Sequence, residues 1–120
     1  MKISEVAKQA RLSISTIRFY ERSGLCPKIG RGSDGKRQFS KTDADWLLLL
    51  ASLRATGMPL SDMRAFAKLY ASGDETILLR KAALEAHRRS LEDRQAELDR
   101  CHTILDQKLK KYDEILEDQL

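Results

Sequence analysis

Hydroxyl and arginine side chains alternate with apolar ones between residues 13 and 22, in the order Ser-Ile-Ser-Thr-Ile-Arg-Phe-Tyr-Glu-Arg. At helical spacing the isoleucines would anchor one side of this segment, and polar side chains would project from the other. An arginine can bind guanine through two hydrogen bonds or grip a phosphate, a hydroxyl can take either role, and a tyrosine offers a donor to phosphate. The segment therefore supplies candidate DNA contacts, namely Ser15, Thr16, Arg18, Tyr20 and Arg22.

A second basic segment follows and is rich in glycine. It places Lys28, Arg31, Lys36 and Arg37 beside the aromatic Phe39. An isolated cation or a lone charge cluster is usually solvated surface, so neither segment alone is strong evidence of DNA binding. DNA binding is favoured by the order of the parts along the chain: a helix-turn-helix, a basic glycine-rich wing, a pair of helices and then a coiled coil.

Residues suited to catalysis or metal binding are not arranged for either role. The sequence contains no spacing of nucleophile, base and acid, no phosphate-binding loop and no metal-ligand cluster. Its two cysteines, Cys26 and Cys101, are far apart, which excludes a disulfide framework and gives no zinc-ligand spacing. We therefore expect a protein that is not an enzyme and holds no metal or cofactor.

Apolar stretches are short. The longest uninterrupted run, Trp46–Ala51, has six residues, whereas a transmembrane helix needs roughly 18 or more. No apolar region follows a basic start in the manner of a signal peptide, and two free thiols fit a reducing compartment. We expect a cytoplasmic protein with no membrane partner.

Two short helices joined by a tight turn are predicted around the first basic segment. Ser4 is expected to cap a helix that ends at Ala10, and Ser13 to cap a second helix that runs to about Ser23. Gly24 is placed to take the left-handed conformation that ends a helix. This layout is a helix-turn-helix.

The side chains expected to face inward from the second helix are Ile14, Ile17 and Phe19.

Residues 25–39 lose the helical period and read as a wing. Ser33–Gly35 is a plausible hairpin tip, and Lys36–Phe39 is expected to form a short strand.

Two further helices are expected after the wing. The first starts at a capping box of Ser40 and Asp43 and ends near Gly57; the second is expected to be recapped by Ser61 after the break at Pro59. Their inward residues are expected to be Trp46, Leu47, Leu50, Leu53, Met63, Phe66, Ala67 and Tyr70.

Charge divides the chain at Ser72-Gly73-Asp74. Residues 1–72 hold 13 Lys and Arg against 6 Asp and Glu, whereas residues 73–120 hold 9 against 12. A basic front half is the footprint expected where phosphates are neutralised. We therefore predict a winged helix-turn-helix DNA-binding domain at 1–72 and a separate helix at 73–120.

The second part predicts a coiled coil. Residues 75–117 contain no Gly or Pro, and apolar side chains recur every seven residues. These are Ile77, Leu84, Leu91, Leu98, Leu105 and Tyr112. A lone helix of this length cannot bury its seam, so we expect it to pair with the same helix of a second chain. Folding back on the chain's own first part is the alternative, which the length makes difficult.

Four stretches resemble the mercury-resistance-regulator (MerR) family. They are residues 3–7, 17–25, 35–39 and 53–60, and the resemblance is close over about residues 2–70. The most specific motif is Arg-Phe-Tyr-Glu shortly before Gly-Leu, within 17–25. By this resemblance, the positions that contact DNA are Ser15, Thr16, Arg18, Phe19, Tyr20, Lys36 and Arg37.

The resemblance also implies a fold and a mechanism. It implies a mainly α protein, with a winged helix-turn-helix followed by a long helix that forms an antiparallel coiled-coil dimer. Such dimers bind palindromic promoters whose spacer is too long for RNA polymerase, and they bend and undertwist the DNA when an effector binds. A dimer that deforms DNA can regulate transcription without leaving its site.

The resemblance is greatest to the branch that responds to aldehydes, electrophiles or nitrosative stress. That branch commonly carries a cysteine in its third helix, but the matching position here is Ser52, whose hydroxyl is too weak a nucleophile to replace a thiolate. Cys101, three residues after Leu98, is expected on the seam side. It is either a small apolar filler, a redox or electrophile switch, or a thiol that pairs with its counterpart in the dimer. Cys26 is expected to be a small buried residue.

Two other functions compete with a promoter-binding homodimer. One is a protein-interaction module that uses the coiled coil while its first part merely folds; the other, weaker, is an enzyme. Salt-sensitive binding to one palindrome but not to a scrambled duplex would separate the first two, because only a regulator needs base readout.

Overall fold

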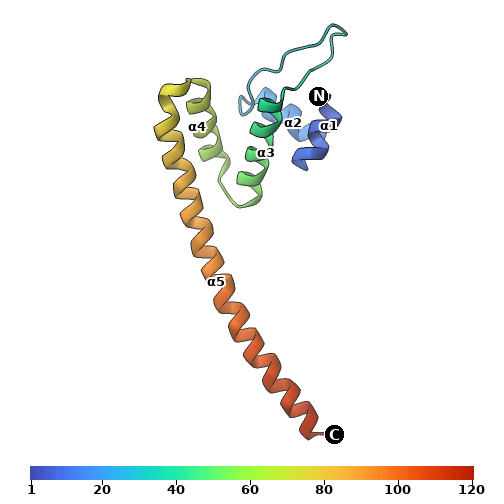
Figure 1. The fold of residues 1–120 in the computed structure, drawn as a ribbon, viewed down its shortest axis with the longest axis vertical. Helices are drawn as coiled ribbons and strands as arrows, with labels where there is room; N and C mark the ends of the chain where they lie inside the picture. The colour runs from blue at the N-terminus through green and yellow to red at the C-terminus, as the bar shows by residue number, and fades with distance from the viewer. The chain divides into compact units, whose positions relative to one another are not determined.

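The computed structural model describes all residues from 1 to 120 and divides into two compact units, Met1–Ala83 and Leu84–Leu120. The fold is mainly helical, as predicted, and contains no extended strand (Figure 1). Its helices are α1 (Ile3–Ala10), α2 (Ile14–Arg22), α3 (Lys41–Ala55), α4 (Leu60–Ala71), the short 3₁₀ helix η1 (Asp74–Thr76) and α5 (Ile77–Asp118). Because α5 begins in the first unit and continues into the second, the functional boundary between residues 72 and 73 stays a prediction.

The start of α1 differs from the prediction. Ser4 lies inside the first turn rather than at the cap, because α1 begins at Ile3 and its N-cap is Lys2, which makes no side-chain capping bond. The Met1 ammonium donates to the Phe39 carbonyl at 2.6 Å, and the Phe39 N–H donates back to the Met1 carbonyl at 2.8 Å. This pairing holds the residue before Lys2 in place, so the helix starts earlier than the serine alone would suggest.

The ends of α2 are those predicted. Ser13 is its N-cap and accepts a hydrogen bond from the Thr16 N–H at 3.1 Å. At the other end Gly24 has φ +79°, and the Leu25 N–H donates to the Tyr20 carbonyl at 2.9 Å. Helices commonly end at a glycine in the left-handed conformation, followed by a backbone N–H that donates to a carbonyl of the last turn.

The inward face of α2 is corrected at one position. Ile17 is fully buried and Ile14 is half-buried, as expected. Phe19, however, is 39% exposed, and its neighbour Tyr20 is buried with 4% exposure. Since Tyr20 follows Ile17 by three residues, both lie on one face of the helix, whereas Phe19 is turned away from it.

The wing is a loop rather than a strand. Its tip at Ser33–Gly35 is a turn, as predicted, with Gly35 at φ +79°. The expected strand at Lys36–Phe39 is wrong, because the only ladder contact is an isolated antiparallel bridge between Arg31 and Arg37. Two short segments with no third strand beside them form too few hydrogen bonds and side-chain contacts to make a regular β-hairpin.

α3 begins with the predicted capping box and α4 begins without one. The Ser40 hydroxyl accepts from the Asp43 N–H at 3.0 Å, and the Asp43 carboxylate accepts from the Ser40 N–H at 2.8 Å. The expected cap at Ser61 is wrong, because α4 starts at Leu60 and its N-cap is Pro59. Pro59 has the extended conformation of an N-cap residue, so the helix begins directly after it and Ser61 lies within the first turn.

Helices α1 to α4 lie together in the first unit (Figure 1). Their buried side chains, together with buried side chains of residues 25–39, form the apolar core. The predicted core residues of α3 and α4 are buried, except that Tyr70 is half-buried. The largest fully buried side chains of this core are Phe39, Ile17, Leu25, Leu47, Leu50, Met63 and Val6.

The long helix α5 has 42 residues and no buried residue. At ~1.5 Å per residue it is about 63 Å long. None of the helices in the chain is both apolar and long enough to cross a membrane.

Candidate nucleic-acid interface

The first turn of α2 gathers three hydroxyls. The Ser13 hydroxyl lies 3.0 Å from that of Ser15 and 2.7 Å from that of Thr16, while it also caps the helix. Ser15 is exposed and Thr16 is half-buried. A hydroxyl keeps further hydrogen-bonding capacity after one such contact, because it has one donor and two acceptor lone pairs. These side chains are therefore held in a fixed arrangement at the surface.

Three cations of this region are exposed and have no acidic partner. Arg18 and Arg22 project from α2, and Lys36 projects from the wing. None of the three makes an ion pair within the chain. Phe19, exposed on the same helix, adds an aromatic surface among them. A surface with unpaired cations and an aromatic ring is suited to a polyanion that offers both phosphates and bases.

Tyr20 combines a buried ring with a hydroxyl that reaches solvent. The residue is 4% exposed, and its ring centroid lies 6.1 Å from that of Phe19. Its hydroxyl makes no hydrogen bond within the chain, yet no buried side-chain oxygen or nitrogen lacks a partner. The hydroxyl must therefore be accessible, which keeps it available as a donor to phosphate although the ring belongs to the core.

An ion pair ties the wing to α2. The Arg37 Nε donates to the Glu21 carboxylate at 2.8 Å, and the two side chains are 29% and 17% exposed. This role of Glu21 was not predicted from the sequence, where its one signal is that it is an acidic residue inside an otherwise basic segment. The Nη groups of Arg37 make no hydrogen bond within the chain, so the guanidinium can hold the wing and still donate outward.

The tip of the wing is ordered by its own polar groups. Arg31 Nη1 donates to the Gly35 carbonyl at 2.8 Å, and the Lys36 N–H donates to Asp34 Oδ1 at 3.0 Å. These bonds present Lys36 outward. The structure thus brings the predicted residues of α2 and the wing into one connected surface, joined through Glu21 and Arg37.

None of the predicted seam residues of α5 is buried. Ile77, Leu98, Leu105 and Tyr112 are each between 51% and 56% exposed, while Leu84 and Leu91 are half-buried. Other apolar side chains of the helix are exposed as well, among them Ile104, Leu109, Ile115 and Leu116. An exposed apolar surface of this extent is typical of an interaction site.

The two cysteines lie in opposite environments. Cys26 is buried, as predicted, and burial raises the pKa of its thiol to about 12, with the carboxylates of Asp43 and Glu21 adding to the shift. Cys101 is exposed on α5, near Leu91 and Leu98 on the same side of the helix. No three His, Cys, Asp or Glu side chains gather closely enough to hold a metal ion.

Comparison with known families matches nearly the whole chain. Residues 1–69 match a family described as "MerR HTH family regulatory protein", and residues 44–108 match one described as "MerR, DNA binding". An uncharacterized HTH-type transcriptional regulator of Haemophilus influenzae is 38% identical over 109 residues, which are 91% of this chain and 81% of that protein. The HTH-type transcriptional regulator AdhR of Bacillus subtilis is 34% identical over 76% of this chain and 65% of its own length.

Solved structures agree with these relatives. A MerR family transcriptional regulator from Listeria monocytogenes superposes with a TM-score of 0.82 at 31% identity, over 94% of this chain and 86% of that one. HiNmlR, described as a MerR family regulator lacking the sensor domain and bound to promoter DNA, superposes with a TM-score of 0.80 at 36% identity, over 94% and 90%. The families and relatives matched are transcriptional regulators rather than enzymes.

Proposed function

The chain belongs to the MerR family of helix-turn-helix regulatory proteins, and from that premise we propose that it binds a palindromic promoter as a homodimer and controls transcription by distorting the promoter DNA. It is a DNA-binding transcriptional regulator by family. The proposal adds which residues contact the duplex, how two chains join, and what the bound dimer does. Its place of action is the cytoplasm.

The observation that carries the proposal is the surface made by α2 and the wing. Arg18, Arg22 and Lys36 are unpaired and exposed there, and the Glu21–Arg37 ion pair holds the wing against the helix. In our proposal α2 lies in the major groove and Arg18 reads a base. The residues that accompany it on bases or phosphates are Ser15, Thr16, Phe19, Tyr20, Arg22, Lys36 and Arg37.

The second chain is recruited by α5. Its seam is apolar and is defined by Ile77, Leu84, Leu91, Leu98, Leu105 and Tyr112; four of these side chains are about half exposed, and Leu84 and Leu91 are half-buried. We propose that two such helices pair antiparallel, which would bury both seams and set two copies of α2 apart on the DNA. Palindromic operators follow from a two-fold symmetric dimer.

DNA distortion is the regulatory step of this proposal. A relative with similar architecture is described as bound to promoter DNA. Bending or untwisting the spacer costs deformation free energy, which the contacts between the dimer and the DNA must offset. The resulting shape of the DNA decides whether RNA polymerase can use the promoter. RNA polymerase is therefore a partner on the same DNA rather than a competitor for it.

The inducing signal is a stress or a small molecule. Ser52 occupies the position where the resembled branch carries a cysteine, and its hydroxyl donates to the Leu48 carbonyl at 3.0 Å. Cys101 is the remaining candidate for a redox sensor, because it is exposed. A promoter-reporter assay with Cys101→Ser tests this: an unchanged response to aldehyde and oxidant would remove Cys101 from the mechanism.

Arg18→Ala tests the DNA-binding proposal. On a palindromic operator the variant should bind more weakly by ~1–3 kcal/mol and lose preference at one base pair, since a good base contact is worth that much. Arg100→Ala is the matched control, because it removes the same charge from an exposed position on α5. Fluorescence anisotropy at fixed salt against operator and scrambled duplexes gives both affinities.

The outcomes separate the candidate functions. Equal loss on every sequence would make Arg18 a phosphate contact. A wild-type chain that binds operator and scrambled duplexes equally at physiological salt would contradict specific regulation. It would favour an interaction module built on the coiled coil.

A further inference from the structure

We propose that Thr76 and Arg80 are positioning residues that hold the first turn of α5 against α4 and thereby set the half-site spacing accepted by the dimer. This role rests on the proposed function, because only a dimer on two half-sites has a spacing to select. It assigns specificity to residues that need not touch DNA.

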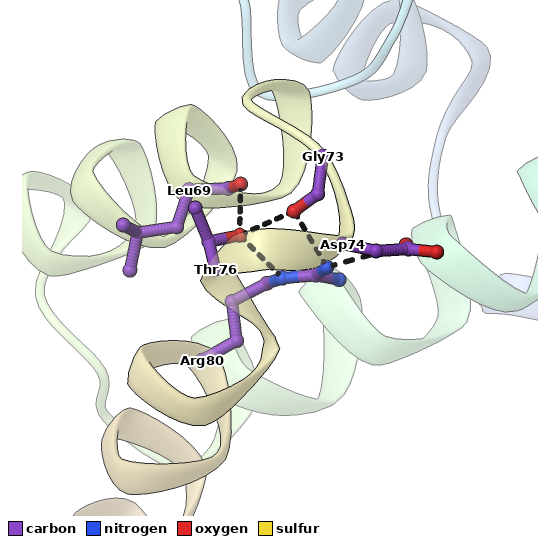
Figure 2. A network of polar contacts seen from close by, with 5 residues as sticks. All are labelled: Leu69, Gly73, Asp74, Thr76 and Arg80. Carbon is purple, nitrogen blue, oxygen red and sulfur yellow. Dashed lines mark hydrogen bonds and ion pairs between the residues drawn. The ribbon is translucent and has the colours of Figure 1, made fainter.

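Thr76 is the centre of a polar network at the root of α5 (Figure 2). It is 8% exposed, and its hydroxyl oxygen lies 2.5 Å from the Leu69 carbonyl oxygen and 2.7 Å from that of Gly73. The same oxygen accepts a hydrogen bond from Arg80 Nε at 3.0 Å. One hydroxyl therefore joins the last turn of α4, the connecting residue Gly73 and the first turn of α5. It is the only buried polar side chain in the chain.

Arg80 closes the network from the α5 side. Its Nη2 donates to the Gly73 carbonyl at 3.2 Å, and its guanidinium carbon lies 5.4 Å from the centroid of the Tyr70 ring. The Arg80 side chain is 19% exposed, whereas that of Asp74, 3.9 Å away, is 98% exposed. An ion pair with so exposed a partner contributes little, so the carbonyl, hydroxyl and aromatic contacts carry the attachment.

The connecting residue has a conformation that favours glycine. Gly73 has φ +101°, and a Cβ atom at this position would lie 3.1 Å from Glu75 Oε2. This backbone lets the chain turn between α4 and η1, and the side chains of Thr76 and Arg80 then fix the direction in which α5 begins.

The network continues through aromatic rings to the end of α2. The Tyr70 ring packs edge-on against Trp46, with centroids 4.0 Å apart. Trp46 Nε1 donates to the Leu25 carbonyl at 2.8 Å, and the Leu25 N–H donates to the Tyr20 carbonyl at 2.9 Å. The root of α5 and the last turn of α2 are thus joined by contacts between packed, largely buried groups.

The length of α5 makes its attachment matter. A rotation of ~5° at the start of a helix about 63 Å long displaces its far end by about 5 Å, which exceeds the ~3.4 Å rise of one base pair. Since α5 is continuous from Ile77 to Asp118, a loosened first turn would alter how far apart the dimer holds its two reading helices.

The test measures binding across a series of duplexes. Two copies of the half-site are placed at the preferred separation and at separations changed by about one and two base pairs. Thr76→Val removes the hydroxyl with little change of shape, and Arg80→Lys keeps the charge but loses the planar fork. Arg89→Gln, an exposed change on α5, is the matched control. Circular dichroism and sedimentation confirm that each variant is folded and dimeric.

We expect the wild type and Arg89→Gln to prefer one separation by about tenfold or more, and Thr76→Val and Arg80→Lys to lose most of that ratio or shift the optimum. Variants that bind more weakly but keep the wild-type ratio would overturn the inference and leave the network a purely structural role. A wild type that ignores sequence would instead overturn the proposed function, and this inference with it. If Thr76→Val does not fold, Arg80→Lys decides.

Discussion

Leucine has opposite surroundings in the two units of the molecule. In Met1–Ala83, Leu47 and Leu50 are fully buried within a core formed by helices of the same chain. In Leu84–Leu120, Leu98 and Leu105 are 56% and 51% exposed, although they too recur at helical spacing. The first unit buries these leucines within the chain, whereas the second leaves the side chains of the proposed seam largely exposed. The comparison separates the leucines that stabilise one chain from those that we propose join two chains.

The largest expected effect comes from breaking the seam. In Leu98→Glu/Leu105→Glu, four leucines per dimer at ~1.5–3 kcal/mol each would lose burial, about 6–12 kcal/mol in all. The dimer dissociation constant should therefore rise by about ten-thousandfold or more, and operator binding should be lost. Sedimentation equilibrium and operator-binding assays measure both.

Ala96→Glu/Thr103→Glu is the matched control for the seam. It adds the same charge to α5 at exposed positions two and five residues away from Leu98, on the far side of the heptad. A dimer that survives Leu98→Glu/Leu105→Glu, or is lost equally in the control, would contradict the seam assignment.

The next largest effect is a difference in reactivity between the two cysteine thiols. Cys26 is in the first unit, and burial raises the pKa of its thiol from 9.0 to about 12. Because the thiolate is the reactive form, labelling of Cys26 at pH 8 should be about a thousandfold slower in the folded chain than in the denatured one. The folded state binds this proton more tightly, so the associated stability is fully present below about pH 9 and is lost as the pH rises toward 12.

Cys101→Ser isolates Cys26 for this measurement with a chromogenic disulfide reagent. In a chain that keeps Cys101, the exposed thiol should react quickly when the seam is broken and more slowly in the intact dimer. Rapid labelling of Cys26 in the folded chain would show that the first unit opens readily and is not the closed core described above.

A smaller effect separates adjacent leucines within the first unit. Leu47→Ala should lower the free energy of unfolding by ~2–5 kcal/mol, because it empties a fully buried site. Leu48→Ala is its matched control, since Leu48 is 47% exposed on the same helix. Urea denaturation followed by circular dichroism gives both values. Equal losses would mean that Leu48 is buried in solution, by a partner or by a different packing of α3.

The smallest effect tests the cap of α2. Ser13→Ala should cost ~1 kcal/mol of stability, because it leaves the Thr16 N–H without its acceptor. Ser33→Ala, at the exposed tip of the wing, should change stability little. If both substitutions were neutral in urea denaturation, the cap would not contribute to holding α2.

Features with local causes were predictable from the sequence. The capping box at Ser40 and Asp43, the cap at Ser13 and the left-handed Gly24 each depend on a few neighbouring residues, and all three are present. The seven-residue repeat predicted the long helix for the same reason. The repeat also predicts a partner helix, which stays a prediction.

Features that depend on distant residues were not predictable in this way. Phe19 and Tyr20 are adjacent aromatic residues, and only the packing of the whole unit decides that Tyr20 is inside. Glu21 forms an ion pair with Arg37 of the wing, and the Thr76 hydroxyl hydrogen-bonds to the Leu69 carbonyl of the preceding helix. No sequence motif predicts either contact. The DNA-contacting roles of the candidate residues stay predictions.

Trp46 gives the molecule a built-in optical probe. It is the single tryptophan of the chain, and it is buried, stacked on Phe66 with ring centroids 5.4 Å apart. Its fluorescence therefore reports the first unit alone, while the far-ultraviolet helical signal is shared with the long α5. Melting followed at both wavelengths can show whether the two units unfold together, and a shift in emission on adding operator would reveal movement near the root of α5 without any attached label.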